Sequence, residues 1–330
     1  MARGPLSVAI LIRTPAKETD AAKQARLLKE AKAALARGTD VNAYNDNGRT
    51  ALMVAVLENH IPILKLLLRQ PKIEVNKTET ETGNTALHFA VKNENIEATK
   101  ILLKDKRVNV NCITDGQMTP LLMTSTDVDK VNIMKLLLET QTIDVNYAMH
   151  SHLPEDEDKN NGMTALMLAS VFSNVEATNL LLEDQRVDVN QMTTLGYTAL
   201  HMAPNQMSEA KFVELLLAHP RVDVNTKMCE PPGPTVLHIA ADQSNAEVVK
   251  LILDNPHFNS ANASAVTEIE GASYNCTAVG VAAVKGNWEI LEELVRHPSI
   301  DLDVNHKPCG KDQLDLQNLI RYDKHFCVHF

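Results

Sequence analysis

The segment GNTALHFAV, from Gly83 to Val91, decides the fold because versions of it recur along the chain. Each version places a threonine in the same register, at Thr50, Thr85, Thr119, Thr164, Thr198, Thr235 and Thr277. By subtraction, successive threonines are 35, 34, 45, 34, 37 and 42 residues apart. Self-similarity at a period of about 20–50 residues is typical of a solenoid. The sequence therefore predicts a repeat of about 34 residues with a few insertions.

A second apolar run follows each of these segments. Most repeats then end with a short motif whose last residue is asparagine, which we call the exit phrase. Examples of the runs are ILKLLL and VVKLIL, and examples of the exit phrases are IEVN and VDVN. Both apolar runs of a repeat have the i, i+3, i+4 spacing that predicts an amphipathic helix. The glycine-containing stretch between successive repeats carries hairpin signals. Each repeat is thus predicted to hold two helices and a projecting loop.

This combination resembles the ankyrin-repeat family, whose unit has two antiparallel helices, a β-hairpin and a TPLHxA motif. The resemblance implies an all-α solenoid of helix-turn-helix units with projecting β-hairpin loops. Seven full repeats and an N-terminal half repeat fill residues 20–306, with loop insertions at about 147–160 and 258–275. We expect residues 1–19 to form an extended or flexible segment and residues 307–330 to cap the C-terminal end. The length therefore counts repeats in one array, although length alone would suggest about two domains.

Residues that recur within the repeats are expected to be structural. The leucines of each second helix should stack against neighbouring repeats, because one helix pair cannot bury its own apolar face. The resemblance implies that His88, His201 and His238 join their threonines in hydrogen bonds that tie each helix start to the neighbouring turn. The exit asparagines are predicted to be turn residues whose amides satisfy backbone groups.

Composition limits the class of protein. The 330 residues carry 42 acidic and 32 basic side chains, a net charge of −10, which argues against a nucleic-acid partner. No stretch approaches the roughly 18 apolar residues of a membrane span. The five cysteines form no CxxC pair, which favours a reducing compartment. We expect a monomeric cytoplasmic protein, with an additional nuclear location as the alternative.

No catalytic motif stands out. The sequence contains no GxSxG, GxGxxG, Walker-type GxxxxGK[ST] or HExxH pattern, so we expect neither an enzyme nor a cofactor. The prediction is a protein–protein interaction scaffold or adaptor. Two narrower alternatives are a substrate-recruiting adaptor of a ubiquitin ligase and an inhibitor that sequesters a transcription factor as NF-κB inhibitors do. The 25 residues after Asn305 are short for a ligase recruitment box, and no DSGxxS motif marks regulated degradation.

The family resemblance implies that partners bind hairpin tips and late positions of each first helix. Most of these positions are polar, such as Thr82, Asn84 and Asp115 at tips and Lys92 and Thr126 on helices. Six positions in the middle of the array are apolar or aromatic: Met118, Met163, Val171, Phe172, Leu195 and Tyr197. Exposed apolar patches mark interaction sites, so we predict a partner groove centred on repeats four to six. The alternative is that the insertion at 147–160 covers Phe172.

Three further features carry weaker hypotheses. The first insertion holds His150, His152 and four acidic residues, and a solvated loop is favoured over a cation site or an acidic docking loop. Near the C-terminus the potential ligands His306, Cys309, His325, Cys327 and His329 have unusual spacing for zinc, so we expect no metal. The exits also resemble substrates of the asparaginyl hydroxylase that acts on hypoxia-inducible factor, because a leucine precedes the asparagine by eight residues at Asn76, Asn146, Asn190 and Asn225.

Overall fold

The computed structural model describes residues 20–150, 161–203, 210–228, 233–259, 264–269, 272–298 and 300. The chain divides into two compact units, Met1–Tyr147 and Ala148–Phe330, and each is described by itself. The boundary falls at the start of the first predicted insertion. The predicted end segments, 1–19 and 307–330, lie outside the described residues, as do residues 151–160 of that insertion.

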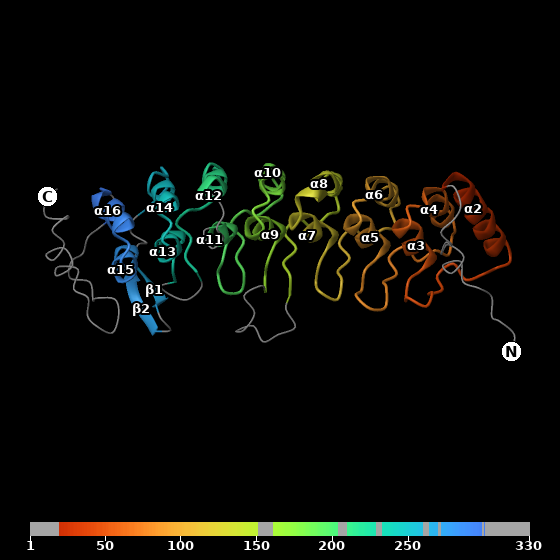
Figure 1. Cartoon of the computed structure of the whole chain (residues 1–330), viewed down its shortest axis with the longest axis horizontal. Helices are drawn as coiled ribbons and strands as arrows, with labels where there is room; N and C mark the ends of the chain where they lie inside the picture. Colours follow the sequence, from red (N-terminus) through yellow and green to blue (C-terminus); the bar gives the residue numbers. More distant parts are fainter. Residues whose placement is uncertain are drawn as a thin grey trace. The chain divides into compact units, whose positions relative to one another are not determined.

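The described part of the first unit consists of one helix followed by three helix pairs (Figure 1). Its elements are α2 (Asp20–Ala36), α3 (Ala51–Leu57), α4 (Ile61–Leu68), α5 (Ala86–Lys92), α6 (Ile96–Leu103), α7 (Pro120–Ser125), the 3-10 helix η1 (Val128–Lys130) and α8 (Val131–Leu138). The inner helices α3, α5 and α7 pack in one row and the outer helices α2, α4, α6 and α8 in another. Loops project from the inner helices, as expected for a helical solenoid.

The second unit repeats this arrangement, with four helix pairs among its described residues. Its elements are α9 (Ala165–Val171), α10 (Val175–Glu183), α11 (Ala199–Met202), α12 (Ala210–Leu217), α13 (Val236–Asp242), α14 (Ala246–Leu253), β1 (Ser264–Ile269), β2 (Ala272–Thr277), α15 (Ala278–Val284) and α16 (Trp288–Arg296). The predicted all-α fold class is confirmed. Within the second predicted insertion, β1 and β2 form a hairpin, since they pair antiparallel from Ser264 opposite Thr277 to Ile269 opposite Ala272.

The recurring threonine begins each inner helix. At α5 the Thr85 hydroxyl accepts a hydrogen bond from the backbone N–H of His88, while His88 Nδ1 accepts one from the Thr85 N–H at 3.1 Å. His88 Nε2 lies 3.1 Å from the carbonyl oxygen of Met118 in the next repeat. The predicted role of this threonine–histidine pair is therefore confirmed. Met53 takes the histidine's place at α3, where its sulfur accepts from the Thr50 N–H.

The core includes residues of both the inner and the outer helices. Most outer helices contain a triplet of successive aliphatic residues, such as Leu66 to Leu68. The middle residue of each triplet is fully buried, as at Leu67, Leu102 and Leu137 in the first unit and Leu181 and Leu216 in the second. Their flanking leucines are half-buried, except Leu182, which is buried. Each middle leucine contacts the preceding or following repeat, so the stability of the array depends on neighbour interfaces.

In several repeats the two helices are joined by a residue in the left-handed region. In the second unit this residue is Gly286 in the last repeat, with φ of 67°, and Ser173 and Ser244 in earlier ones. In the first unit Asn59 and Glu94 hold it, at φ of 54° and 53°. Left-handed backbone is unfavourable for residues with a Cβ atom, so these four turns carry local strain that Gly286 avoids.

Candidate functional site

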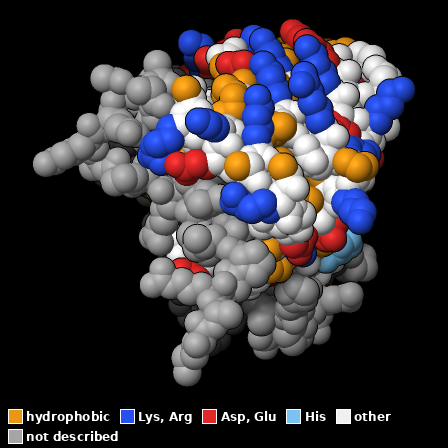
Figure 2. Space-filling model, turned by 90° about the vertical axis from the view of Figure 1, so that its right-hand side faces the viewer, with side chains coloured by type: hydrophobic (Ala, Val, Ile, Leu, Met, Phe, Trp, Pro, Cys, Tyr) orange, Lys and Arg blue, Asp and Glu red, His pale blue; other side chains and the backbone are white. Residues whose placement is uncertain are grey.

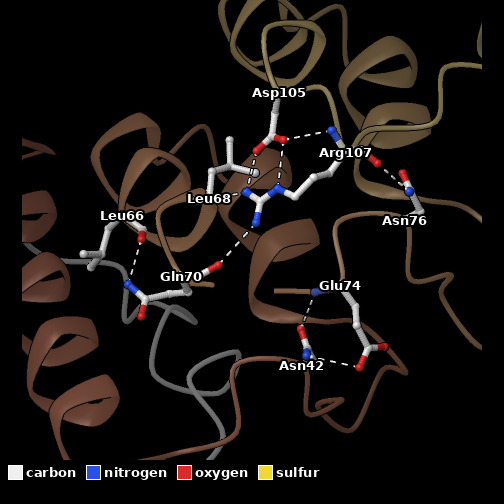
Figure 3. Close-up of polar contacts among 8 residues, drawn as sticks. All are labelled: Asn42, Leu66, Leu68, Gln70, Glu74, Asn76, Asp105 and Arg107. Carbon is white, nitrogen blue, oxygen red and sulfur yellow. Dashed lines mark hydrogen bonds and ion pairs between the residues drawn. The ribbon is translucent and has the colours of Figure 1, made fainter. Parts of the chain in front are cut away.

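The exit asparagines connect successive repeats. Asn76 donates from its amide nitrogen to the carbonyl of Arg107 at 2.8 Å, and its amide oxygen accepts from the Asn109 N–H at 2.7 Å. Asn42 forms the same pair of contacts one repeat earlier, with the carbonyl of Lys72 and with the N–H of Glu74. Figure 3 shows the contact with Glu74. These asparagines therefore satisfy backbone groups, as expected, and those groups lie 30 or more residues away in the sequence. These asparagines are therefore part of the scaffold.

We call these connections between successive repeats asparagine joints. At several of them an arginine adds further hydrogen bonds to the preceding repeat. The guanidinium of Arg107 donates to the carbonyls of Leu68 and Gln70 at the C-terminal end of α4, and it pairs with Asp105 (Figure 3). This hydrogen bond from Arg107 lowers the pKa of the Asp105 carboxyl. Arg221 reaches the C-terminal carbonyls of α10 in the same way. A cation at a helix C-terminus is stabilising because it complements the helix dipole.

The four asparagines predicted to be hydroxylated lie at such joints or at the equivalent exit. Asn190 and Asn225 have both ends of the amide engaged, as Asn76 has, and all three are half-buried. The backbone N–H of Asn146 donates to Asp144 at 3.1 Å. A hydroxylase would have to detach these side chains from the next repeat before it could reach them. Hydroxylation stays a prediction.

A groove of about 500 Å³ lies in the first unit, between two neighbouring hairpin loops and the inner helices α5 and α7. Tip residues and late helix residues face it together: Glu81, Thr82, Asn84, Lys92, Thr114, Asp115, Gly116, Met118, Met123, Thr126 and Lys130. The hairpin tips and late helix positions named from the sequence in repeats two and three therefore share one surface. We call it the repeat 2–3 groove.

The walls of the repeat 2–3 groove are held by hydrogen bonds within one hairpin and between neighbouring hairpins. The Asp115 N–H donates to the carbonyl of Thr82 at 3.1 Å, and the Thr114 N–H donates to the carbonyl of Met118 at 3.1 Å. Glu79, which is buried behind the first wall, accepts from Arg49 at 3.1 Å and from the Thr82 hydroxyl. The loops are thus fixed before any partner arrives.

The lining of the groove mixes apolar and charged groups. Met118 and Met123 are half-buried and offer flexible apolar surface. Lys130 forms an ion pair with Asp127, whose pKa this contact lowers. Lys92 is exposed and has no ion pair within the described part of the chain. The arrangement can hold an apolar side chain and an anionic group at once.

The six apolar residues named from the sequence belong to two different units. Met118 belongs to the first unit, where it lines the groove, and the other five belong to the second. Phe172 is 55% exposed at the end of α9, while Val171, Leu195 and Tyr197 are half-buried. The tyrosine ring stands edge-on to His201.

Met163 does not lie on an exposed surface, so that expectation was wrong. Only 4% of its surface is exposed. Its backbone carbonyl accepts from the Met149 N–H at 2.9 Å, and this bond closes the hairpin directly before α9. Sequence reasoning also missed the repeat 2–3 groove as a shared surface, because most of its residues are polar and, apart from Met118, did not stand out when read singly.

Other kinds of site find no support in the described residues. Among them no group of three or more His, Cys, Asp or Glu side chains is placed to hold a metal ion. His306, Cys309, His325, Cys327 and His329 lie outside those residues, and so do His152 and the acidic run of the first insertion. No helix in the described ranges is both long and apolar enough to cross a membrane.

Comparison with known proteins identifies the family. The family model for ankyrin repeats matches residues 19–79, 72–149, 146–228 and 205–307, so the chain belongs to the ankyrin-repeat family. Ankyrin repeats are generally protein–protein interaction modules and not catalysts, which implies protein partners for this chain. A crystal structure titled "EF0377 an Ankyrin Repeat Protein" shares the fold, with a TM-score of 0.52 at 24% identity over 64% of this chain and 99% of that one.

Two curated proteins share a shorter stretch of sequence. The human and bovine "SMC5-SMC6 complex localization factor protein 1" are 35% and 34% identical to this chain over 94 residues. That stretch is 28% of this chain and 9% of either relative. The likeness therefore concerns one part of much longer proteins.

Proposed function

We propose that this chain is an adaptor that binds a protein partner through its hairpin tips and inner helices. The observation that carries the proposal is the repeat 2–3 groove, whose walls are fixed by inter-hairpin hydrogen bonds while lining side chains such as Lys92 are free of ion pairs in the described residues. A preformed surface avoids the ordering entropy that a flexible site would lose on binding.

The chemistry of the groove suggests which segment would fit. An apolar side chain of the partner would contact Met118 and Met123, since thioether side chains adapt to varied shapes. A carboxylate of the partner would face Lys92. The name of the curated relatives describes a localization factor for a protein complex, which is in keeping with a binding role.

A second contact is proposed in the second unit. Phe172 is the aromatic residue with the largest exposed fraction among the described large apolar side chains, and aromatic anchors dominate many interfaces. Val171, Leu195 and Tyr197 remain proposed neighbours of this contact. Replacing Phe172 by alanine should weaken capture of a partner, whereas Asn93→Ala, at the equivalent position of repeat two, should not.

Affinity capture from cells tests the groove. Tagged wild type would be compared with the double variant Lys92→Glu, Met123→Ala and with Lys211→Glu, an exposed lysine of the second unit, by quantitative mass spectrometry. We expect specific partners to be lost from the groove variant and kept by the control, with unchanged thermal unfolding. Retention of every partner by a folded groove variant would contradict the proposal.

The same capture separates the narrower roles. Ubiquitin-ligase subunits among the partners would indicate a substrate-recruiting adaptor. A Rel-type transcription factor would indicate a sequestering inhibitor. Neither role has a structural observation in its favour, because the C-terminal segment lies outside the described residues.

A further inference from the structure

The outer helices of the first unit present one lysine at the same position each. Each of these lysines lies three residues before the last leucine of its helix. They are Lys32 of α2, Lys65 of α4, Lys100 of α6 and Lys135 of α8. All four are exposed. We call them the lysine row. Because neighbouring outer helices pack together, successive ammonium groups of the row are separated by about one interhelical distance, roughly 10 Å.

The surroundings of the lysine row are also basic. Among the residues whose side chains the structure describes, the four helices carry six basic and two acidic residues: Arg26, Lys29, Lys32, Lys65, Lys100 and Lys135 against Glu30 and Glu97. Figure 2 shows Lys and Arg side chains gathered at the end of this unit that α2 forms, with apolar side chains between them. A positive face therefore exists on a chain whose net charge is −10.

Little of this charge is neutralised within the described residues. Lys65 lies 3.7 Å from Glu97, and both side chains are more than half exposed. Arg26 pairs with Glu30 at 3.0 Å. Exposed pairs of this kind contribute little, and they leave the cation accessible to another anion. No ion pair holds Lys32, Lys100 or Lys135 in the part of the chain that the structure describes.

The repeat itself does not require these lysines. In the second unit the equivalent residues are Asn179, Glu214, Lys250 and Glu292. The four outer helices there carry seven acidic and three basic residues: Glu176, Glu183, Glu214, Glu247, Glu289, Glu292 and Glu293 against Lys211, Lys250 and Arg296. Stacking is the same in both units, so the lysine row is an addition to the scaffold.

We propose that the lysine row is a docking site for an acidic protein segment that runs across α2, α4, α6 and α8. A spacing of roughly 10 Å matches every third residue of an extended strand, which rises about 3.3 Å per residue. It also matches about seven residues of a helix. The partner would therefore carry carboxylates at one of these periods. This face is formed by outer helices, so the proposal goes beyond the groove and does not depend on it.

The composition of the face favours a polypeptide over nucleic acid. Proteins that bind single strands stack bases on aromatic side chains, and α2, α4, α6 and α8 contain no aromatic residue. Between the lysines lie half-buried aliphatic side chains such as Leu28, Leu66 and Ile101. These can contact apolar side chains of an acidic segment, whereas a sugar–phosphate backbone offers them no equivalent partner.

Fluorescence anisotropy with the full chain tests the site. The probe is a labelled peptide with glutamate at every third residue and serine or leucine between. We expect the double variant Lys65→Glu, Lys100→Glu to bind roughly tenfold more weakly or worse, because two attractions become repulsions. Lys250→Glu, at the equivalent position in the second unit, should bind as wild type does. Binding by wild type should weaken as salt is added.

The variants are expected to fold, because glutamate already occupies this helix position at Glu214 and Glu292. Circular dichroism and thermal unfolding would check this. Three results would each overturn the proposal: equal affinity of the double variant, equal loss in Lys250→Glu, or tighter binding of an oligothymidylate or of phosphatidylserine vesicles than of the peptide.

Discussion

In the first unit the row of equivalent outer-helix positions holds Lys65, Lys100 and Lys135, whereas in the second it includes Glu214 and Glu292. The residues that face the neighbouring repeat do not change in this way, since the middle leucine of each triplet is buried in both units. This difference shows at which positions the packing of the repeats restricts the choice of residue. Stacking restricts the buried positions, and the exposed ones are left for recognition.

The units also differ in regularity. Threonines of the first unit are 35 and 34 residues apart, while those of the second are 34, 37 and 42 apart and the second also contains the β1–β2 hairpin. Its helix α11 is short, because it ends at Met202, two residues before Pro204 in the sequence. The following predictions test whether the shared scaffold behaves alike in the two units.

The largest effect is expected from the stacking core. Leu102→Ala in the first unit and Leu216→Ala in the second each remove a fully buried side chain, which should lower the free energy of unfolding by about 2–5 kcal/mol. Urea denaturation followed by circular dichroism measures this. A loss below about 1 kcal/mol in one unit only would show that the two cores are not equivalent.

Acid should destabilise both units through the motif histidines. Burial lowers the pKa of His88 and His201 from 6.5 to about 4, so at intermediate pH the unfolded chain binds more protons than the folded one. Stability is full above pH 6.5 and falls as the pH drops from 6.5 towards 4, by about 2 kcal/mol per histidine at pH 5. His88→Met introduces the residue that Met53 already provides at this position of the first repeat. This variant should lose the contribution of His88 to the pH dependence of stability. An unchanged pH dependence of urea denaturation in that variant would contradict this role.

The asparagine joints should contribute comparably in the two units. Asn76 and Asn190 make matched pairs of hydrogen bonds to the following repeat. Replacing either by alanine removes two bonds at a half-buried site, and we expect a loss of about 1–2 kcal/mol. Hydrogen exchange of the Asn109 and Asp223 amides reports each joint directly. Faster exchange of both amides is expected, and unchanged exchange of either would argue against its joint.

The smallest effect concerns the turn inside each repeat. Glu94→Gly should raise the free energy of unfolding by less than about 1 kcal/mol, because glycine tolerates the left-handed backbone but loses more entropy on folding. Gly286→Ala should lower it by about 1 kcal/mol. No atom lies within 4 Å of a Cβ built at Gly286, so the effect there is one of backbone alone. Opposite signs in thermal unfolding are the expected outcome.

Much of the scaffold could be predicted because its rules are local. The threonine–histidine pair of α5 spans three residues, so the pattern of residues 83–91 contains it. Exposure could not be predicted in the same way. Met163 and Met118 both directly precede a motif threonine, yet Met163 is buried and Met118 lines the groove, because the hairpins around them differ. The exposure of Phe172 agrees with the pattern, although its role in binding stays a proposal.

The sequence by itself determined the repeat, the helix pairs, the caps and the buried leucines, since each follows from periodicity or from residues a few positions apart. Only the tertiary structure decided what neighbouring repeats do together. Arg107 reaches a carbonyl 39 residues away at Leu68, and Thr82 and Asp115 meet to form one groove wall. Such contacts depend on how one repeat is rotated against the next, and that rotation is set by packing over the whole interface.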